Sequence, residues 1–92
     1  MKKTDWEKLP VSMDLSERLP SGDQLSSAGS TLIVEDSNGK AVPEMVLDIA
    51  VSPVAVYGTI GGGIVGCSYT LRFKGLTNLG NQIEGRSTLE II

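Results

Sequence analysis

Hydrophobic and polar residues alternate along most of the chain, which is the pattern of β-strands that bury one face. The clearest stretch runs from Cys67 to Lys74. Its apolar face would consist of Cys67, Tyr69, Leu71 and Phe73. Because the single Phe of the chain and one of its two Tyr fall there, we expect this strand to cross the centre of the core. Cys67 is then expected to be a buried, inert thiol.

The same period predicts six further short strands. They are Val11–Ser16, Gln24–Ser27, Ser30–Asp36, Met45–Val51, Val54–Ile60 and Ile83–Ile92. Gly85, inside the last of them, is expected to mark a β-bulge. No segment has helical spacing, so almost no helix is expected. The predicted core consists of Met13, Leu15, Leu25, Leu32, Val34, Leu47, Ile49, Val56, Tyr69, Leu71, Phe73, Leu89 and Ile91.

Two glycine-containing turns are predicted. Asn38-Gly39 favours a two-residue type I′ turn, which would join Thr31–Asp36 to the segment after Ala41 as a hairpin. Gly61, Gly63 and Gly66 fit the spacing of a dinucleotide-binding loop, but that loop opens a helix at its third glycine. Here a strand pattern follows instead, so Gly61, Gly62, Gly63, Ile64 and Gly66 are interpreted as a corner between strands, with no cofactor.

Seven short strands separated by turns predict an all-β, immunoglobulin-like antiparallel β-sandwich. The spacing Gly66-x-x-Tyr69-x-Leu71 is typical of a tyrosine corner, in which the Tyr hydroxyl bonds to upstream backbone. Residues 11–92 would form this single domain, and residues 1–10 a polar arm that ends in Pro10. Trp6 on the arm either covers the domain locally or anchors a partner.

Composition argues against several functions. The net charge of −3 and pI near 4.7 disfavour nucleic acid and electrostatic membrane binding. No apolar run approaches the length needed to span a bilayer. With one Cys and no His, neither an internal disulfide, an activated thiol nor a transition-metal site is expected. We therefore predict no catalytic, cofactor or metal residues, and no enzymatic activity.

The charged residues are expected to be structural or solvated. Asp14, Glu17 and Asp23 surround the first turn and could in principle support glycoside hydrolysis or bind calcium weakly. Capping and solvation are the favoured interpretation, and Asp23 is expected to hydrogen-bond turn backbone. The basic residues on polar strand faces form no evident stripe; these are Arg18, Arg72, Lys74 and Arg86.

We therefore expect the protein to act through contacts that its surface makes with partners. Predicted partner contacts are Trp6 on the arm, the Ser52-Pro53 turn and the loop Gly61–Ile64. Edge strands could also accept a partner strand by β-augmentation.

Two blocks of the sequence resemble a family of small phage and prophage proteins of the fibre–tail adaptor, or tail-associated, type. The first, Ser12–Ser27, has an Arg-Leu turn and a Gly-Asp pair followed by an apolar residue and serines. The second comprises Val56–Leu71, Thr77–Gly80 and the Glu84–Ile92 strand. The resemblance covers roughly residues 11–92 and implies an immunoglobulin-like sandwich without catalytic residues.

The same resemblance implies a virion structural or adaptor role in tail assembly or fibre attachment. Its partners would be other phage tail or virion proteins, and the chain could also form a homo-oligomer. The protein would be made in the host cytoplasm and then enter the tail of the virion. Two alternatives stay open as well: a standalone cytoplasmic immunoglobulin-like binding module, and a carbohydrate-binding or adhesive domain.

Overall fold

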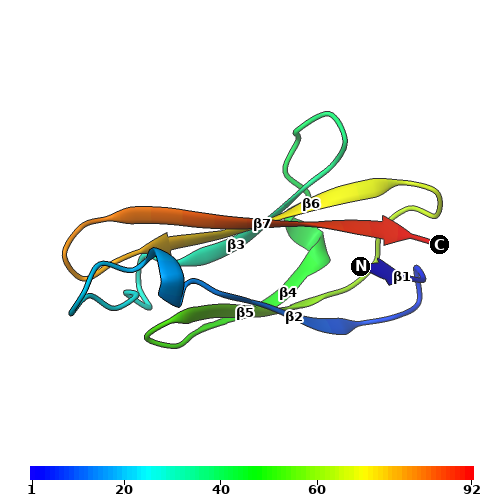
Figure 1. The fold of residues 1–92 in the computed structure, drawn as a ribbon. Coiled ribbons are helices and arrows are strands. Elements are labelled where there is room, and N and C mark those ends of the chain that lie inside the picture. The colour runs from blue at the N-terminus through cyan, green and yellow to red at the C-terminus, as the bar shows by residue number, and fades with distance from the viewer.

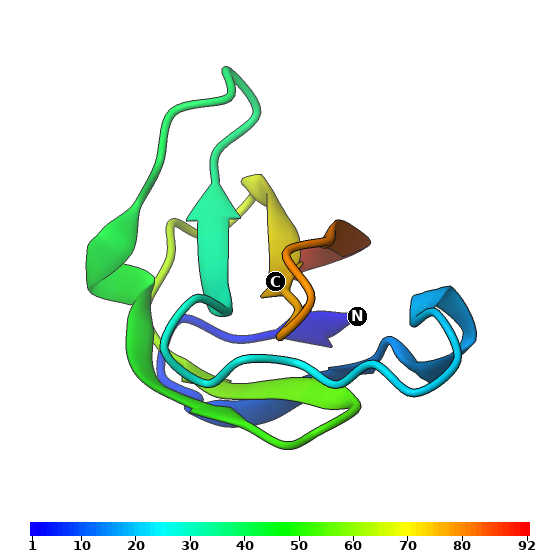
Figure 2. The same ribbon diagram turned by 90° about the vertical axis from the view of Figure 1, so that its left-hand side faces the viewer.

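The computed structural model describes residues 1–92 and consists of two β-sheets packed face to face (Figures 1 and 2). A four-stranded sheet, here sheet A, has the order β1-β7-β6-β3, and a three-stranded sheet B has the order β2-β5-β4. The strands are β1 Lys2–Lys3, β2 Leu9–Asp14, β3 Thr31–Glu35, β4 Val46–Val51, β5 Ala55–Ile60, β6 Ser68–Leu76 and β7 Gln82–Ile91. Two short 3-10 helices, η1 Ser16–Arg18 and η2 Pro43–Met45, complete the chain. The predicted all-β, immunoglobulin-like sandwich is confirmed.

β6 is the central strand of sheet A, as its alternation predicted. It pairs with β7 along its whole length and with β3 from Thr70 to Lys74. Tyr69, Leu71 and Phe73 point into the core and are at most 5% exposed. They share one hydrophobic core with side chains of sheet B, including Val56 and Ile60, while the polar residues of β6 lie on its outer face.

Cys67 is exposed, so its predicted burial is wrong. Its backbone N–H donates to the carbonyl of Ile64 at 3.0 Å, which places it in a turn just before β6. The preceding Gly66 has a φ of 87°. Because this turn precedes the regular ladder, the alternation of β6 does not extend back to Cys67.

The predicted core is confirmed for most positions and wrong for β4. Leu47 and Ile49 are 48% and 42% exposed. β4 is the edge of sheet B, and its register shifts between Val46 and Asp48. Leu47 is the extra residue at this shift, and Ile49 lines an open groove between β4 and β3. Met13 is half-buried against the core. The confirmed core positions are Leu15, Leu25, Leu32, Val34, Val56, Tyr69, Leu71, Phe73, Leu89 and Ile91.

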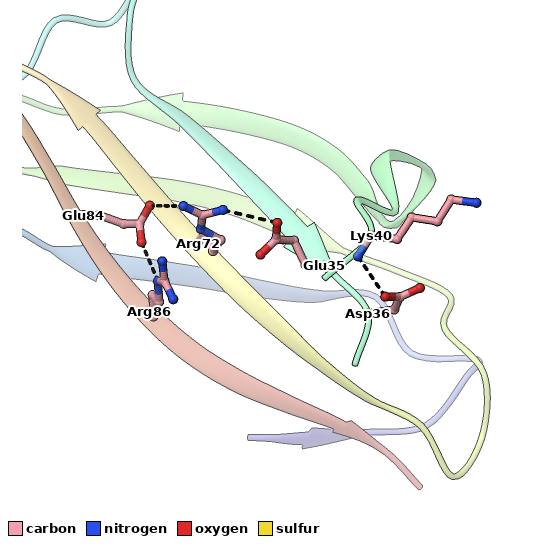
Figure 3. Close-up of polar contacts among 6 residues, drawn as sticks. All are labelled: Glu35, Asp36, Lys40, Arg72, Glu84 and Arg86. Atoms are coloured by element: carbon pink, nitrogen blue, oxygen red, sulfur yellow. Dashed lines mark hydrogen bonds and ion pairs between the residues drawn. The ribbon is translucent and has the colours of Figure 1, made fainter. Parts of the chain in front are cut away.

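The type I′ turn predicted at Asn38-Gly39 is wrong, but the two arms that it was expected to join do pair over a short stretch. Glu35 bridges Ala41, the N–H of Asp36 donates to the Lys40 carbonyl at 2.9 Å, and the N–H of Val42 donates to the Val34 carbonyl at 2.8 Å. The pairing does not continue into β4, which lies in the other sheet. Gly39 has a φ of 79°, but no residue other than glycine has a positive φ, which excludes type I′ at Asn38. The Asp36 carboxylate instead accepts the backbone N–H of Asn38 and of Lys40, both at 2.9 Å. Figure 3 shows the bond between Asp36 and Lys40.

Gly85 does not mark a bulge, because the register between β6 and β7 is unbroken and Gly85 lies opposite Phe73. A Cβ atom at Gly85 would lie 2.7 Å from Cγ of Met13. The glycine therefore makes room for a β2 side chain from the other sheet. The strand predicted at Gln24–Ser27 is reduced to one bridge between Leu25 and Thr77.

The N-terminal ten residues are integrated into both sheets. β1 pairs in parallel with β7, the one parallel pair in the sandwich, and β2 begins at Leu9 rather than Val11. Lys3 is 1% exposed, and its ammonium donates to the carbonyls of Thr4 at 2.6 Å and Gly62 at 2.5 Å. The alternating pattern missed β1 because two residues are too few to show a period. No helix of the chain has the length and apolarity needed to cross a membrane.

Candidate protein-contact surface

One end of the sandwich gathers the connection between β1 and β2, the loop between β3 and β4, and the corner between β5 and β6. The strand registers require this, because Leu9 pairs with Ile60 and Glu35 with Thr70. Both chain termini lie at the same end (Figure 1). We call it the loop end. Clusters of connections at the ends of a sandwich are common binding surfaces, since the strands hold them in place.

Trp6 is the most exposed large apolar side chain at the loop end, at 89%. It sits on a short turn in which Glu7 N–H donates to the Thr4 carbonyl at 3.3 Å and Thr4 N–H donates to Oε1 of Glu7 at 2.7 Å. Its exposure excludes a role as a local cover of the domain. A shallow cleft of about 640 Å³ lies beside it, lined by Asp5, Trp6, Glu7, Lys8, Leu9 and Gly62.

The corner between β5 and β6 carries the second exposed apolar group, Ile64 and Val65, which are 67% and 58% exposed. The N–H of Ile64 donates to the hydroxyl of Tyr69 at 3.1 Å. The bond predicted from the tyrosine-corner spacing is thus confirmed. Gly66 N–H donates to the Ile91 carbonyl at 2.8 Å, so the corner is fastened on both sides of its apolar tip.

The glycines of this corner make its path possible. Gly62, Gly63 and Gly66 have φ values of 71°, 99° and 87°, in the region that only glycine adopts without strain. At Gly63 a Cβ atom would also lie 2.8 Å from the side chain of Ile91. The predicted corner between strands is confirmed, since β6 follows it directly.

The Ser52-Pro53 turn lies at the opposite end of the molecule, between β4 and β5. The Ser52 hydroxyl accepts the N–H groups of Val54 at 3.3 Å and Ala55 at 3.0 Å. The Pro53 carbonyl accepts the N–H of Leu25 at 2.8 Å. The structure therefore brings Trp6 and Gly61–Ile64 to one end and separates Ser52 and Pro53 from them.

Asp23 organises this opposite end from a buried position, at 7% exposure. Its carboxylate accepts the N–H of Gln24 at 2.9 Å and of Leu79 at 3.3 Å, and the side-chain amide of Asn81 at 3.1 Å. The bonding to turn backbone expected of Asp23 is confirmed. Burial would raise the Asp23 pKa, but these bonds and one from Thr77 outweigh it, so the pKa lies below its ordinary value.

The acidic residues of the first turn do not converge with Asp23. Asp14 accepts the N–H of Ser16 at 2.8 Å, and this backbone bond lowers the Asp14 pKa. No three side chains of the types His, Cys, Asp or Glu lie together in a way that could hold a metal ion.

Basic residues predicted to be scattered instead meet on the outer face of sheet A (Figure 3). The Arg72 guanidinium donates to Glu84 at 2.8 Å and to Glu35 at 3.2 Å, and Arg86 also pairs with Glu84. Arg18 donates to the backbone carbonyl of Glu84 at 2.8 Å. The hydrogen bond between Arg72 and Glu84 raises the pKa of Arg72 and lowers that of Glu84. Only the strand register could have shown that these residues are neighbours.

The comparisons with known proteins bear on the fold. Neither a protein-family model nor a curated protein sequence matches the chain. Among solved structures, the chain is similar to CopC from Methylosinus trichosporium OB3b, with a TM-score of 0.64 and 22% sequence identity over 98% of this chain and 80% of that one. This likeness supports the immunoglobulin-like β-sandwich. At such low sequence identity, this likeness does not assign a function to the chain.

Proposed function

We propose that this chain is a non-enzymatic structural or adaptor protein of a phage or prophage, acting through protein–protein contacts in tail assembly or fibre attachment. The observation that carries the contact role is Trp6, which is 89% exposed on a hydrogen-bonded turn. Trp is strongly enriched among the residues that dominate binding energy. The assignment to a tail rests on the resemblance of residues 11–92 to fibre–tail adaptor proteins.

The loop end favours contacts for a second reason. Ile64 and Val65 are exposed at the tip of a corner that Tyr69 and Ile91 hold in place. Side chains on fixed backbone lose less freedom on binding than side chains on a mobile loop. Burying one such large apolar side chain contributes about 1.5–3 kcal/mol. In a particle with many copies, contacts of this size add up to strong attachment.

Mass spectrometry of particles purified from an induced culture of the source strain tests the proposal. We expect the chain at a fixed stoichiometry with tail proteins. Trp6→Ala should lower its incorporation, because the exposed anchor is lost. Leu79→Ala is the matched control, since Leu79 is 71% exposed at the opposite end of the molecule. Presence in the soluble lysate but absence from particles would contradict the tail role and favour a standalone cytoplasmic binding module.

A carbohydrate-binding or adhesive domain is the second candidate. The cleft beside Trp6 favours it, because an indole face with Asp5 and Glu7 nearby combines an apolar platform with carboxylate acceptors. Glu7 already accepts the N–H of Thr4 through one oxygen, which leaves its second oxygen available. Binding to immobilised glycans that Trp6→Ala abolishes would support this candidate. Glycan binding unchanged by Trp6→Ala would remove it from this cleft.

A further inference from the structure

β4 is an exposed, apolar edge strand. It pairs with β5 on one side only, and Leu47, Asp48, Ile49 and Ala50 are all exposed. Asp48 is its single charged residue. Natural edge strands usually carry Lys, Pro, several charges or a β-bulge that prevents pairing with another strand. β4 has a register shift between Val46 and Asp48, but from Asp48 to Val51 its pairing with β5 is regular and Asp48 is the single charge.

The free edge of β4 also presents unpaired backbone groups. Ser52 N–H donates to the Ala55 carbonyl at 2.9 Å across the turn between β4 and β5. Bonded and non-bonded positions alternate along an antiparallel pair, so Ile49 and Val51 occupy non-bonded positions opposite β5. Their N–H and C=O groups therefore point toward the free edge. No backbone bond outside the strands involves either residue.

An apolar groove of about 360 Å³ flanks this edge, where the sandwich is open between β4 and β3. Leu32, Val34, Pro43 and Ile49 are among its lining residues. The β3 side of the groove is already occupied by the following loop, because Val42 N–H donates to the Val34 carbonyl at 2.8 Å. β4 is therefore the edge at which a further strand could pair.

We propose that the β4 edge joins two copies of this chain through an antiparallel β4–β4 pair centred on Ile49 of each copy. In that register Ile49 lies opposite Ile49 of the second copy, where the outward backbone groups of both strands can bond. Asp48 falls opposite Ala50, and Leu47 opposite Val51. The arrangement is isologous, so one strand supplies both halves of the interface.

This register favours a second copy because it places no like charges opposite one another. Asp48 pairs with Thr59 of β5 on the outer face, so its carboxylate stays away from the apolar groove, where burial would be costly. Pro43 and Pro53 lie outside the paired segment, 47–51, so no proline removes an N–H from this edge. Sheet B, with three strands in each copy, would become one continuous sheet.

The dimer adds a second copy of the chain to the partners of the proposed function. Only the role of the dimer in a particle rests on the proposed function. Sedimentation of the purified full chain tests it, with dimer expected to increase with protein concentration. Ile49→Lys would set two ammonium groups opposite each other and should raise the dimer dissociation constant about tenfold or more. Leu79→Lys makes the same charge change on the exposed turn between β6 and β7 and should leave the dissociation constant unchanged.

A mixture of Ile49→Lys and Ile49→Glu variants gives a sharper test, because position 49 meets itself across the two-fold axis. The mixture should form heterodimers, seen by native mass spectrometry, more readily than either variant forms homodimers. A monomer at all concentrations, or a dimer that survives Ile49→Lys, would overturn the proposal. Binding of an added apolar peptide at this edge by a chain that stays monomeric would also overturn it.

Hydrogen exchange of the unmodified protein needs no variant. The amides of Ile49 and Val51 should exchange more slowly as concentration rises, while the amides of β6 stay unchanged. No such dependence would overturn the β4 pairing. These outcomes are separate from the particle experiment: a dimer in a chain absent from particles supports the β4 interface and contradicts only the tail role.

Discussion

At the scale of single residues, Tyr69 joins the core to the loop end. Its ring is buried at 5% exposure, and its hydroxyl accepts the N–H of Ile64 at 3.1 Å. One side chain thus fills the centre of the sandwich and fixes the corner that carries Ile64 and Val65. The geometry of the contact surface therefore depends on a residue that no partner would touch.

Tyr69→Phe should lower the free energy of unfolding by about 1 kcal/mol, because the ring still packs while the hydrogen bond is lost. Urea denaturation of the variant and the parent protein measures this difference. Tyr57→Phe is the matched control, since Tyr57 is 44% exposed on β5 and should show almost no change. Equal stability of Tyr69→Phe and the parent would mean that water replaces the hydroxyl at no cost.

At the scale of elements, β1 is a two-residue strand fastened by its side chain as well as its backbone. The N–H groups of Glu90 and Ile92 donate to the carbonyls of Met1 at 3.0 Å and Lys3 at 2.8 Å. The buried ammonium of Lys3 also ties this strand to Gly62 in the corner. So short a strand is stable only where additional contacts support it.

Lys3→Ala should release β1 from the edge of β7. Hydrogen exchange would then become faster at the amides of Glu90 and Ile92, because their acceptors are the carbonyls of Lys3 in β1 and of Met1 just before it. Lys2→Ala is the control: Lys2 is exposed and pairs with Glu90 only at 3.8 Å, a surface contact that contributes little. Exchange that is equally fast in both variants would show that the buried ammonium does not hold the strand.

At the scale of the whole molecule, buried or paired carboxylates connect segments distant in the chain. Asp23 links the loop before β3 to the turn between β6 and β7, and Glu84 links β7 to β6 through Arg72. Hydrogen bonds to the charged forms lower the pKa of both carboxyls. The folded state therefore binds fewer protons than the unfolded state in acid.

Stability should consequently be highest above the ordinary carboxyl range and should fall as the pH drops below about 4. Asp23→Asn should reduce this dependence, because the residue no longer binds a proton on unfolding. Urea denaturation at a series of pH values measures it, with the exposed Asp5→Asn variant as control. An identical pH dependence in Asp23→Asn and the parent would contradict the contribution assigned to Asp23.

The sequence by itself determined the fold class, the central strand and the corner. The alternation of apolar and polar residues along β6 and β7 is a local property. It is expected of a strand in any β-sandwich, because the side chains that point into the core must be apolar. The Gly66-x-x-Tyr69 spacing likewise predicted a bond spanning only five residues. These features depend on neighbours along the chain, so the chain could show them.

Only the tertiary structure decided which strands lie at an edge and which loops meet. Leu47 and Ile49 alternate as core residues do, yet they are exposed, because Leu47 lies at a register shift and Ile49 lines the open groove between β4 and β3. The separation of Ser52-Pro53 from Trp6 likewise follows from strand register. Burial and proximity are set by contacts between residues distant in the chain, and no local pattern in a single sequence specifies those contacts.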